Sequence, residues 1–405
     1  MQKLIVLFSI LFLINANPQG IVIKSLQVYT SDNSVSIPVV DETNRLVIEF
    51  DVKSPAYPEL NIVFRFCNRD WSPLDNAFFL NQGKNIAYYP DFERLPLTVE
   101  DADYHFRGEF PDKNGYVDFP YSGKWQFNIV SANDTSIVYA SGRFYVVYQQ
   151  LKMNVTLKNE ELEDETFFPS DLAKVFNITS GFNLPDELFP FNVDFLEIVE
   201  NKKIDYPYII DRKFNTNRRQ FYWNADRKFT FTARDIRPGN EYRVADFRNT
   251  NKFISKDINA QFDGLEYSRF FKQGKHDLNG GFLLTDFNDE FATYLNVKFS
   301  FRPPEDFSGK IFITGSFNDW KVQPEFELEN IYGVYQKIIK LKRGRYDYQY
   351  VAADNINGEL KNIDWFIFEG NNWETTNEYN IFLFYKDQNF GGYDRIISHY
   401  KLIKK

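Results

Sequence analysis

The sequence has few of the residues from which catalytic and metal sites are usually built. Its 405 residues include a single cysteine, Cys67, and three histidines, His105, His276 and His399. One cysteine cannot form an internal disulfide. The histidines lie far apart, with none at the short spacing typical of metal ligands. A metal or catalytic centre built on these residues is therefore not expected.

Recognised catalytic and ligand-binding motifs are also missing. The chain contains no G-x-S-x-G turn, no H-E-x-x-H pair and no glycine-rich loop of the kind that holds a phosphate. Acidic pairs are so frequent that none stands out as the two carboxylates of a glycosidase. Residues 112–115 supply part of a calcium loop without its remaining ligands, and a hairpin turn explains them better. We predict no catalytic, cofactor-binding or metal-binding residue, and we do not expect an enzyme.

Basic residues are fewer than acidic ones, with 47 Lys and Arg against 56 Asp and Glu, so the chain is acidic. An acidic protein does not attract the phosphate backbone of DNA or RNA. Nucleic acid is therefore not an expected partner.

Long apolar runs are confined to the N-terminus. Residues 4–14 are apolar apart from Ser9, follow Lys3 and precede the small residue Ala16. This pattern is typical of a secretory signal peptide over residues 1–16, with an N-terminal anchor helix as the alternative. The run is too short to span a bilayer comfortably. We expect a soluble mature protein without direct membrane insertion, and a secreted chain without disulfides fits the bacterial periplasm.

Aromatic residues, by contrast, are abundant, with 43 Phe and 25 Tyr in the chain. Aromatic and β-branched side chains favour pleated, half-buried surfaces. Apolar residues alternate with polar ones in many segments, as in 46–52, 62–66, 125–129 and 295–301. No segment of convincing length has the 3.6-residue period of a helix. The sequence predicts an all-β protein.

The length of the chain is too great for one ordinary core. Turns and alternating segments over residues 19–148 predict an N-terminal β-sandwich of immunoglobulin-like size. Residues 149–288 are β-rich but irregular, and we assign them to a middle domain. Residues 289–405 alternate clearly again and predict a C-terminal immunoglobulin-like β-sandwich. We expect tandem sandwiches behind the signal peptide.

A loop of unusual composition separates two aromatic-rich runs at residues 368–379. Gly370 and Asn371 tolerate uncommon backbone angles, and Thr375 and Thr376 offer hydroxyl groups to nearby backbone. The composition predicts a specific, rigid loop between strands. It indicates a role for shape and partner recognition rather than for chemistry.

The segment Gly315–Trp320, followed by the alternating strand 346–350, resembles the starch- and glycogen-binding immunoglobulin-like modules of the early-set type. In those modules aromatic rings near this position stack on sugar rings. The resemblance makes a glycan-binding module, acting through the C-terminal domain and Trp320, the alternative function. The competing interpretation is structural, with Asn318 and Asp319 in a turn and Trp320 folded over the end of the sandwich.

Short motifs follow one another in a recognisable order along almost the whole mature chain. They are 67–73 (CNRDWSP), 121–125 (YSGKW), 143–146 (RFYV), 241–248 (EYRVADFR), 315–320 (GSFNDW), 341–348 (LKRGRYDY), 369–379 and 393–395 (YDR). Taken together, they resemble the plug protein family of the type IX secretion system. The order is more specific than any single motif, and the match is looser between residues 149 and 220.

The resemblance implies a soluble periplasmic protein, peripheral to the inner face of the outer membrane. Such a protein docks on the periplasmic mouth of the giant outer-membrane β-barrel translocon and closes the channel when no substrate is passing. The family brings no catalytic residues. Trp71, Trp320 and Trp373, all beside turns, are our candidates for the partner interface, and the alternative is that each packs inside its own domain.

Overall fold

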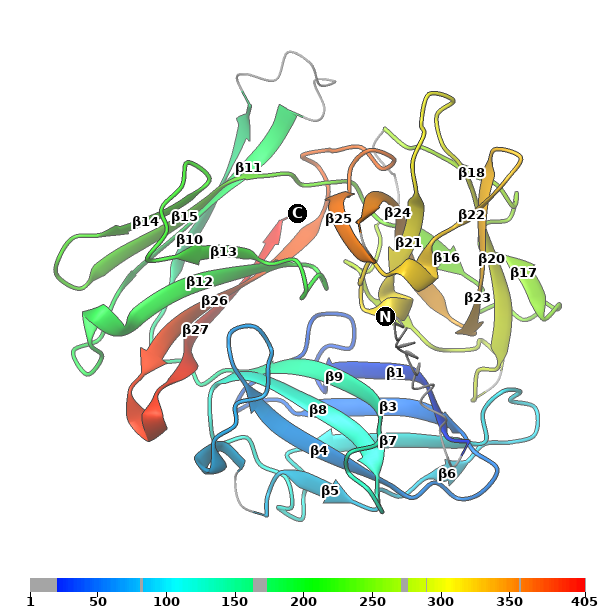
Figure 1. Ribbon diagram of the computed structural model, residues 1–405, viewed down its shortest axis with the longest axis horizontal. Helices are drawn as coiled ribbons and strands as arrows, with labels where there is room; N and C mark the ends of the chain where they lie inside the picture. Colours follow the sequence, from blue (N-terminus) through cyan, green and yellow to red (C-terminus); the bar gives the residue numbers. More distant parts are fainter. Residues whose placement is uncertain are drawn as a thin grey trace, which may run out of the picture.

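The protein is built from β-strands joined by turns and short 3-10 helices, which confirms the predicted all-β class. The described strands form six sheets, and the sheets pack in pairs into three lobes (Figure 1). None of the described helices is long and apolar enough to cross a membrane. The computed structural model describes residues 20–80, 83–162, 173–270, 276–288, 290–356 and 358–404, and the predicted signal peptide at 1–16 lies outside them.

The first lobe is a sandwich whose strands all lie within the predicted range 19–148. Its two sheets have the strand orders β1-β3-β7-β6 and β2-β9-β8-β4-β5, and β2 is the one strand here that pairs in parallel, with β9. The strands are β1 (Val22–Thr30), β2 (Val39–Val40), β3 (Leu46–Lys53), β4 (Leu60–Cys67), β5 (Ile86–Tyr88), β6 (Glu93–Arg94), β7 (Tyr104–Phe110), β8 (Gly123–Ser131) and β9 (Val138–Val146).

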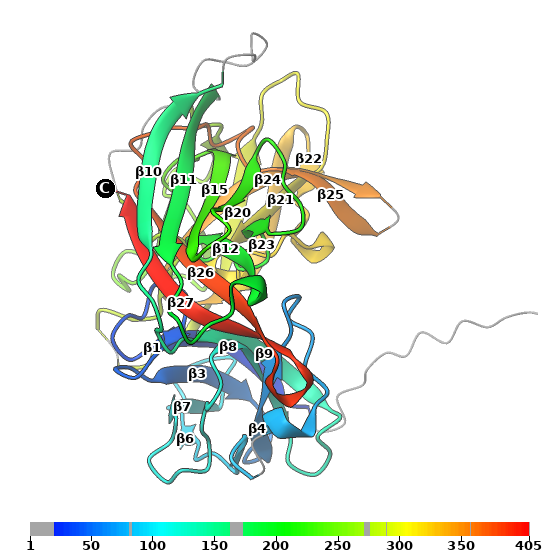
Figure 2. The same ribbon diagram turned by 90° about the vertical axis from the view of Figure 1, so that its left-hand side faces the viewer.

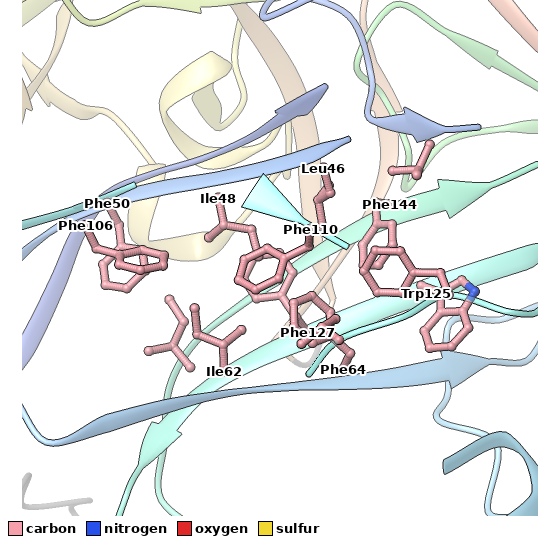
Figure 3. Packing of buried hydrophobic residues seen from close by; sticks show 14 of the residues in the cluster. Leu46, Ile48, Phe50, Ile62, Phe64, Phe106, Phe110, Trp125, Phe127 and Phe144 are labelled. Atoms are coloured by element: carbon pink, nitrogen blue, oxygen red, sulfur yellow. The ribbon is translucent and has the colours of Figure 1, made fainter. Parts of the chain in front are cut away.

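Aromatic rings fill the core of the first lobe (Figure 3). Phe64 of β4 lies at its centre, and its ring centroid is 5.0 Å from that of Phe110, 6.0 Å from that of Phe127 and 6.2 Å from that of Phe144. These four side chains are buried. Aromatic pairs at such separations stabilise a core beyond the area they bury. The alternation of the sequence thus places one face of each central strand against the facing sheet.

The second lobe is completed by the C-terminal end of the chain. Its sheets have the orders β10-β11-β15-β14 and β13-β12-β26-β27. The last hairpin joins antiparallel to β12, where Ile198 lies opposite Ile381. The strands are β10 (Asn154–Glu161), β11 (Lys174–Asn183), β12 (Val193–Glu200), β13 (Tyr208–Asp211), β14 (Arg219–Trp223), β15 (Lys228–Ile236), β26 (Asn377–Asp387) and β27 (Tyr393–Lys404).

The third lobe is inserted into the second, between β15 and β26. One of its sheets has the order β16-β24-β19, with β21 and β25 also paired to β24, and the other has the order β17-β20-β23-β22, with β18 paired to β20. The strands are β16 (Arg243–Asp246), β17 (Asp257–Asn259), β18 (Glu266–Tyr267), β19 (Phe282–Leu283), β20 (Tyr294–Arg302), β21 (Ile311–Gly315), β22 (Glu329–Ile331), β23 (Val334–Lys342), β24 (Arg345–Ile356) and β25 (Glu359–Asp364).

The sheets therefore divide the chain differently from the predicted ranges 149–288 and 289–405. The hairpin at 377–404 belongs to the second lobe, and the strands between 243 and 283 belong to the third. The physical reason is that alternation identifies a strand and its buried face, whereas the partner of the strand is chosen by long-range packing.

Two linkers cross between the second and third lobes, and they are hydrogen-bonded to each other. The backbone N–H of Asn372 and the hydroxyl group of Thr375 donate to the carbonyl oxygen of Gly239, at 2.7 and 3.0 Å. The side-chain amide of Asn377 donates to the carbonyl oxygen of Pro238 at 2.7 Å. The loop predicted at 368–379 supplies the second crossing. Because the two crossings are joined, neither can act as a free hinge.

Buried ionic contacts connect the first lobe to the third. Asp51 of β3 lies 2.8 Å from the ammonium group of Lys342, 2.8 Å from the hydroxyl group of Tyr294 and 2.8 Å from Nδ1 of His105. Burial acts to raise the pKa of Asp51, but the hydrogen bonds from His105, Lys342 and Tyr294 and the charge of Lys342 outweigh it, and the pKa is lowered. Asp51 is therefore held ionised in the seam between the lobes.

A second buried pair connects the first lobe to the second. The ammonium group of Lys124 in β8 lies 2.7 Å from Oε2 of Glu197 in β12, and the hydroxyl group of Tyr145 donates to Oε1 of Glu197 at 2.9 Å. All three side chains are buried. Seen from the side, the first lobe lies beneath the second (Figure 2). The contacts fix the lobes in one arrangement.

Candidate docking surface

Exposed phenylalanines lie at one end of the second lobe, on connections between strands that are found at the left of Figure 1. Phe189, Phe191 and Phe214 are 70%, 73% and 71% exposed. They lie on the connections that enter β12 and leave β13. We call these three residues, together with Arg212 and Trp223, the aromatic end. Large apolar side chains that remain in water and lie together mark contact surfaces for partners.

The first connection is held in place by Tyr385 of β26. Pro190 opens a short 3-10 helix, Pro190–Asn192, because its fixed φ suits the first helical position. The backbone N–H of Phe189 and the side-chain amide of Asn192 donate to the Tyr385 hydroxyl group at 3.1 and 3.2 Å. The phenylalanines at 189 and 191 are thus presented from a fixed backbone.

Arg212 ties the second connection to the first. Its Nη1 donates to the carbonyl oxygens of Phe191 at 2.6 Å, of Pro190 at 3.2 Å and of Val193 at 3.3 Å. The guanidinium carbon lies 5.6 Å from the ring centre of Phe191 and 5.4 Å from that of Trp223. Arginine and aromatic residues dominate binding energy at protein interfaces, above all where their conformations are fixed beforehand.

Two of the three tryptophans proposed as partner contacts are half-buried inside the chain. The ring of Trp71 lies 5.1 Å from that of Tyr145, under the charges of Lys124 and Arg143. The indole N–H of Trp373 donates to the carbonyl oxygen of Val175 at 3.2 Å. Trp71 packs in the seam of the first and second lobes, and Trp373 packs on the core of the second. A contact of either residue with a partner stays a prediction.

The prediction for Trp320 is wrong. Trp320 is 1% exposed, its indole N–H donates to the carbonyl oxygen of Gly280 at 2.7 Å, and its ring packs on Tyr242 at 4.1 Å. A buried ring cannot offer a face to a partner or to a sugar, so the structural interpretation of Gly315–Trp320 holds. Large aromatic side chains gain most free energy from burial, which explains why this tryptophan packs inward.

The histidines and the cysteine lie apart in the fold. His105 is in the first lobe, His276 is on the surface of the third, and His399 is in the second. Burial raises the pKa of the Cys67 thiol to about 12, so the thiol is neutral and unreactive. Among the residues that the structure describes, no group of three or more His, Cys, Asp or Glu side chains could hold a metal ion.

Three carboxylates that are far apart in sequence, those of Glu241, Asp277 and Asp347, accept hydrogen bonds from backbone N–H groups in or next to the 276–281 loop, Asp277 from Tyr242 at 2.5 Å. Glu241 accepts a hydrogen bond from the backbone N–H of Asp277 at 3.4 Å, and Asp347 accepts from the backbone N–H groups of Leu278 and Gly280 at 2.6 and 3.0 Å. Burial raises the pKa of Asp347 to about 7. The carboxylates hold the 276–281 loop against β24. No sequence signal connects them, because Glu241 is brought near Asp347 by the long-range pairing of β16 with β24.

Comparison with known proteins bears directly on the first lobe. Residues 23–148 match the family model of the type 9 secretion system plug protein 1st domain. The first lobe is therefore similar to the first domain of type 9 secretion system plug proteins. The resemblance inferred from the sequence is thereby confirmed, and the match supports a role related to type IX secretion.

The fold of the whole chain recurs in a hypothetical protein from Parabacteroides merdae, known from a crystal structure at 2.30 Å resolution. The TM-score is 0.75, the identity is 18%, and the likeness covers 94% of this chain and 97% of that one. At this identity the likeness shows the fold alone. No curated protein matches the chain.

Proposed function

We propose that this protein is a periplasmic plug, which docks on the periplasmic mouth of the type IX translocon barrel and closes it when no substrate passes. It would lie at the inner face of the outer membrane. The observation that carries the proposal is the match of residues 23–148 to the plug domain family.

The joined lobes support the proposal. A plug must resist deformation by the pressure of a substrate or solute, and three sandwiches connected by buried ion pairs and paired linkers supply such bulk. The pair of Lys342 and Asp51 and the pair of Lys124 and Glu197 each join different lobes. Breaking either pair would leave a buried charge without its partner, so separation of the lobes is opposed.

The aromatic end supports docking and suits a contact that must also be released. It offers a few exposed rings around one fixed arginine, rather than a core-like apolar face. Interfaces that form and dissociate carry their affinity in a few such residues within a polar rim. We assign Phe191 and Phe214 to the contact with the translocon.

The proposal is tested by purification of the tagged protein from outer membranes. We expect a very large barrel protein to copurify, and deletion of the gene to raise the permeability of the outer membrane to large antibiotics. Unchanged permeability, together with no barrel in the purified fraction, would exclude the plug function.

The docking surface is tested by the variant F191S/F214S, with F262S as a matched control in the third lobe, where Phe262 is 80% exposed. Each exposed ring that anchors an interface contributes about 2 kcal/mol or more, so we expect recovery of the barrel to fall by more than tenfold for the double variant and to stay unchanged for F262S. If the wild type, the double variant and F262S recover the barrel equally, the contact lies on another surface.

A further inference from the structure

A cavity with two adjoining chambers lies in the seam between the lobes. The first chamber, of about 190 Å³, is bounded by β1 of the first lobe and by β19, β20 and β23 of the third. The second, of about 60 Å³, also reaches the turn after β12 in the second lobe. The chambers share Leu26, Phe282 and Ser316 as wall residues. All three lobes therefore contribute to the walls of one small cavity.

Each chamber contains a lysine without an ionic partner. Lys24 projects over the ring of Tyr294, 4.9 Å from its centre, and Lys202 projects over the ring of Phe282, 5.7 Å from its centre. Neither ammonium group has a hydrogen bond or an ion pair with a described residue, whereas the neighbouring Lys342 is paired with Asp51. Burial lowers the pKa of both Lys24 and Lys202.

Both lysines are positioned by strained backbone. Ser25, which follows Lys24, has φ +50° and lies in a break of the pairing between β1 and β3. Asn201, which precedes Lys202, has φ +49°. A left-handed conformation is costly for a residue with a Cβ, more so for serine than for asparagine, and such strain gathers at functional sites.

The walls define the chemistry of a ligand. Apolar side chains such as Leu26, Phe282 and Phe317 are among the wall residues, and Asp319 is the one acidic residue among those that form the walls. An inorganic anion would lose its hydration against such walls. A carboxylate with a small apolar body would offer a charge opposite to that of the lysines and an apolar surface to the walls. The volume suits a ligand smaller than a typical drug-sized molecule.

We propose that this seam cavity binds a small organic carboxylate, whose charge is neutralised by Lys24 and Lys202. The ligand would contact residues of the first and third lobes together and would stabilise their arrangement. The proposal does not depend on docking to the translocon.

The test is calorimetric titration of the mature chain with benzoate and, separately, with inorganic phosphate. We expect a Kd for benzoate on the order of 1 mM or below and binding of phosphate at least tenfold weaker. K24M and K202M should each weaken benzoate binding by tenfold or more, while K361M, which changes an exposed lysine of β25, should leave it unchanged. Phosphate binding as tight as benzoate binding would overturn the role of the apolar walls.

A measurement on the unaltered protein guards against misfolding of the variants. Acetylation of lysines is followed by mass spectrometry with and without benzoate. Protection of Lys24 and Lys202, but not of Lys361, is the expected result. No protection of either lysine, or benzoate affinity unchanged in both K24M and K202M, would overturn the proposal.

Discussion

Among single residues, His399 connects the stability of the second lobe to pH. Its Nε2 lies 2.9 Å from Oδ1 of Asn380, and its ring stacks on Phe382 at 4.8 Å. Burial lowers the pKa of His399 from the ordinary 6.5 to about 4. Burial disfavours the charged ring, so the imidazole stays neutral in the folded protein.

Replacement of His399 by asparagine is expected to remove a pH dependence of stability. Between pH 6.5 and 4 the unfolded chain binds a proton at this residue and the folded chain does not, so the free energy of unfolding falls as the pH falls. The full contribution is up to about 3 kcal/mol. Urea unfolding at pH 7.5 and 4.5 measures it, with H276N, at an exposed histidine, as the control. Equal pH dependence in H399N and the wild type would contradict the assignment.

A substitution of Phe64 measures how much the aromatic core stabilises the first lobe. Its ring is buried among other rings, so Phe64→Ala creates a cavity and should lower the free energy of unfolding of this lobe by about 3–5 kcal/mol. Phe78→Ala, at a side chain that is 64% exposed, should change it by less than about 0.5 kcal/mol. Denaturant unfolding of both variants measures the difference. A small effect of Phe64→Ala would mean that the rings repack around the gap.

The candidate site shows that the exposure of a single side chain is hard to predict from the sequence. Trp320 lies beside a turn, so the sequence suggested an exposed interface residue. In the structure its ring is buried. Phe191 and Phe214 were missed because they lie where the family motifs are loosest and because exposure depends on neighbouring loops. The sequence pattern Phe-Pro-Phe at 189–191 was the available signal, since proline fixes the backbone between two rings.

At the scale of elements, the strands were predictable and their pairing was not. Alternation at 46–52 and 295–301 placed β3 and β20 and their buried faces correctly. The same alternation in β26 gave no sign that its partner is β12, a pairing that spans nearly half of the chain. Strand pairs that close such long loops depend on packing of the whole molecule.

Truncation after Thr376 is expected to unfold the second lobe alone. It removes β26 and β27, two of the four strands in one sheet, and exposes the facing core around Phe229 and Phe231. Hydrogen exchange should show loss of protection over 154–236, with the first lobe still protected. Removal of residues 404–405 only is the control. Retained protection over 154–236 would show that the sheet is stable without its C-terminal hairpin.

At the scale of the whole molecule, the buried pair of Asp51 and Lys342 should make the first and third lobes unfold together. D51N leaves the Lys342 ammonium group buried without a counter-charge, at an expected cost of about 3–5 kcal/mol. The double variant D51N/K342M should lose less than the sum of the single variants, since neither charge remains unpaired. Calorimetry measures the coupling. Strict additivity would mean that the pair does not connect the lobes.

The insertion of the third lobe into the second also determines the order in which the lobes can fold during synthesis. The N-terminal sandwich can close as soon as its own residues are available, and the inserted sandwich can follow. The lobe that carries the aromatic end must wait, because β26 and β27 follow the inserted sandwich in the chain. A nascent chain therefore lacks a finished aromatic end until both strands of this hairpin have been made.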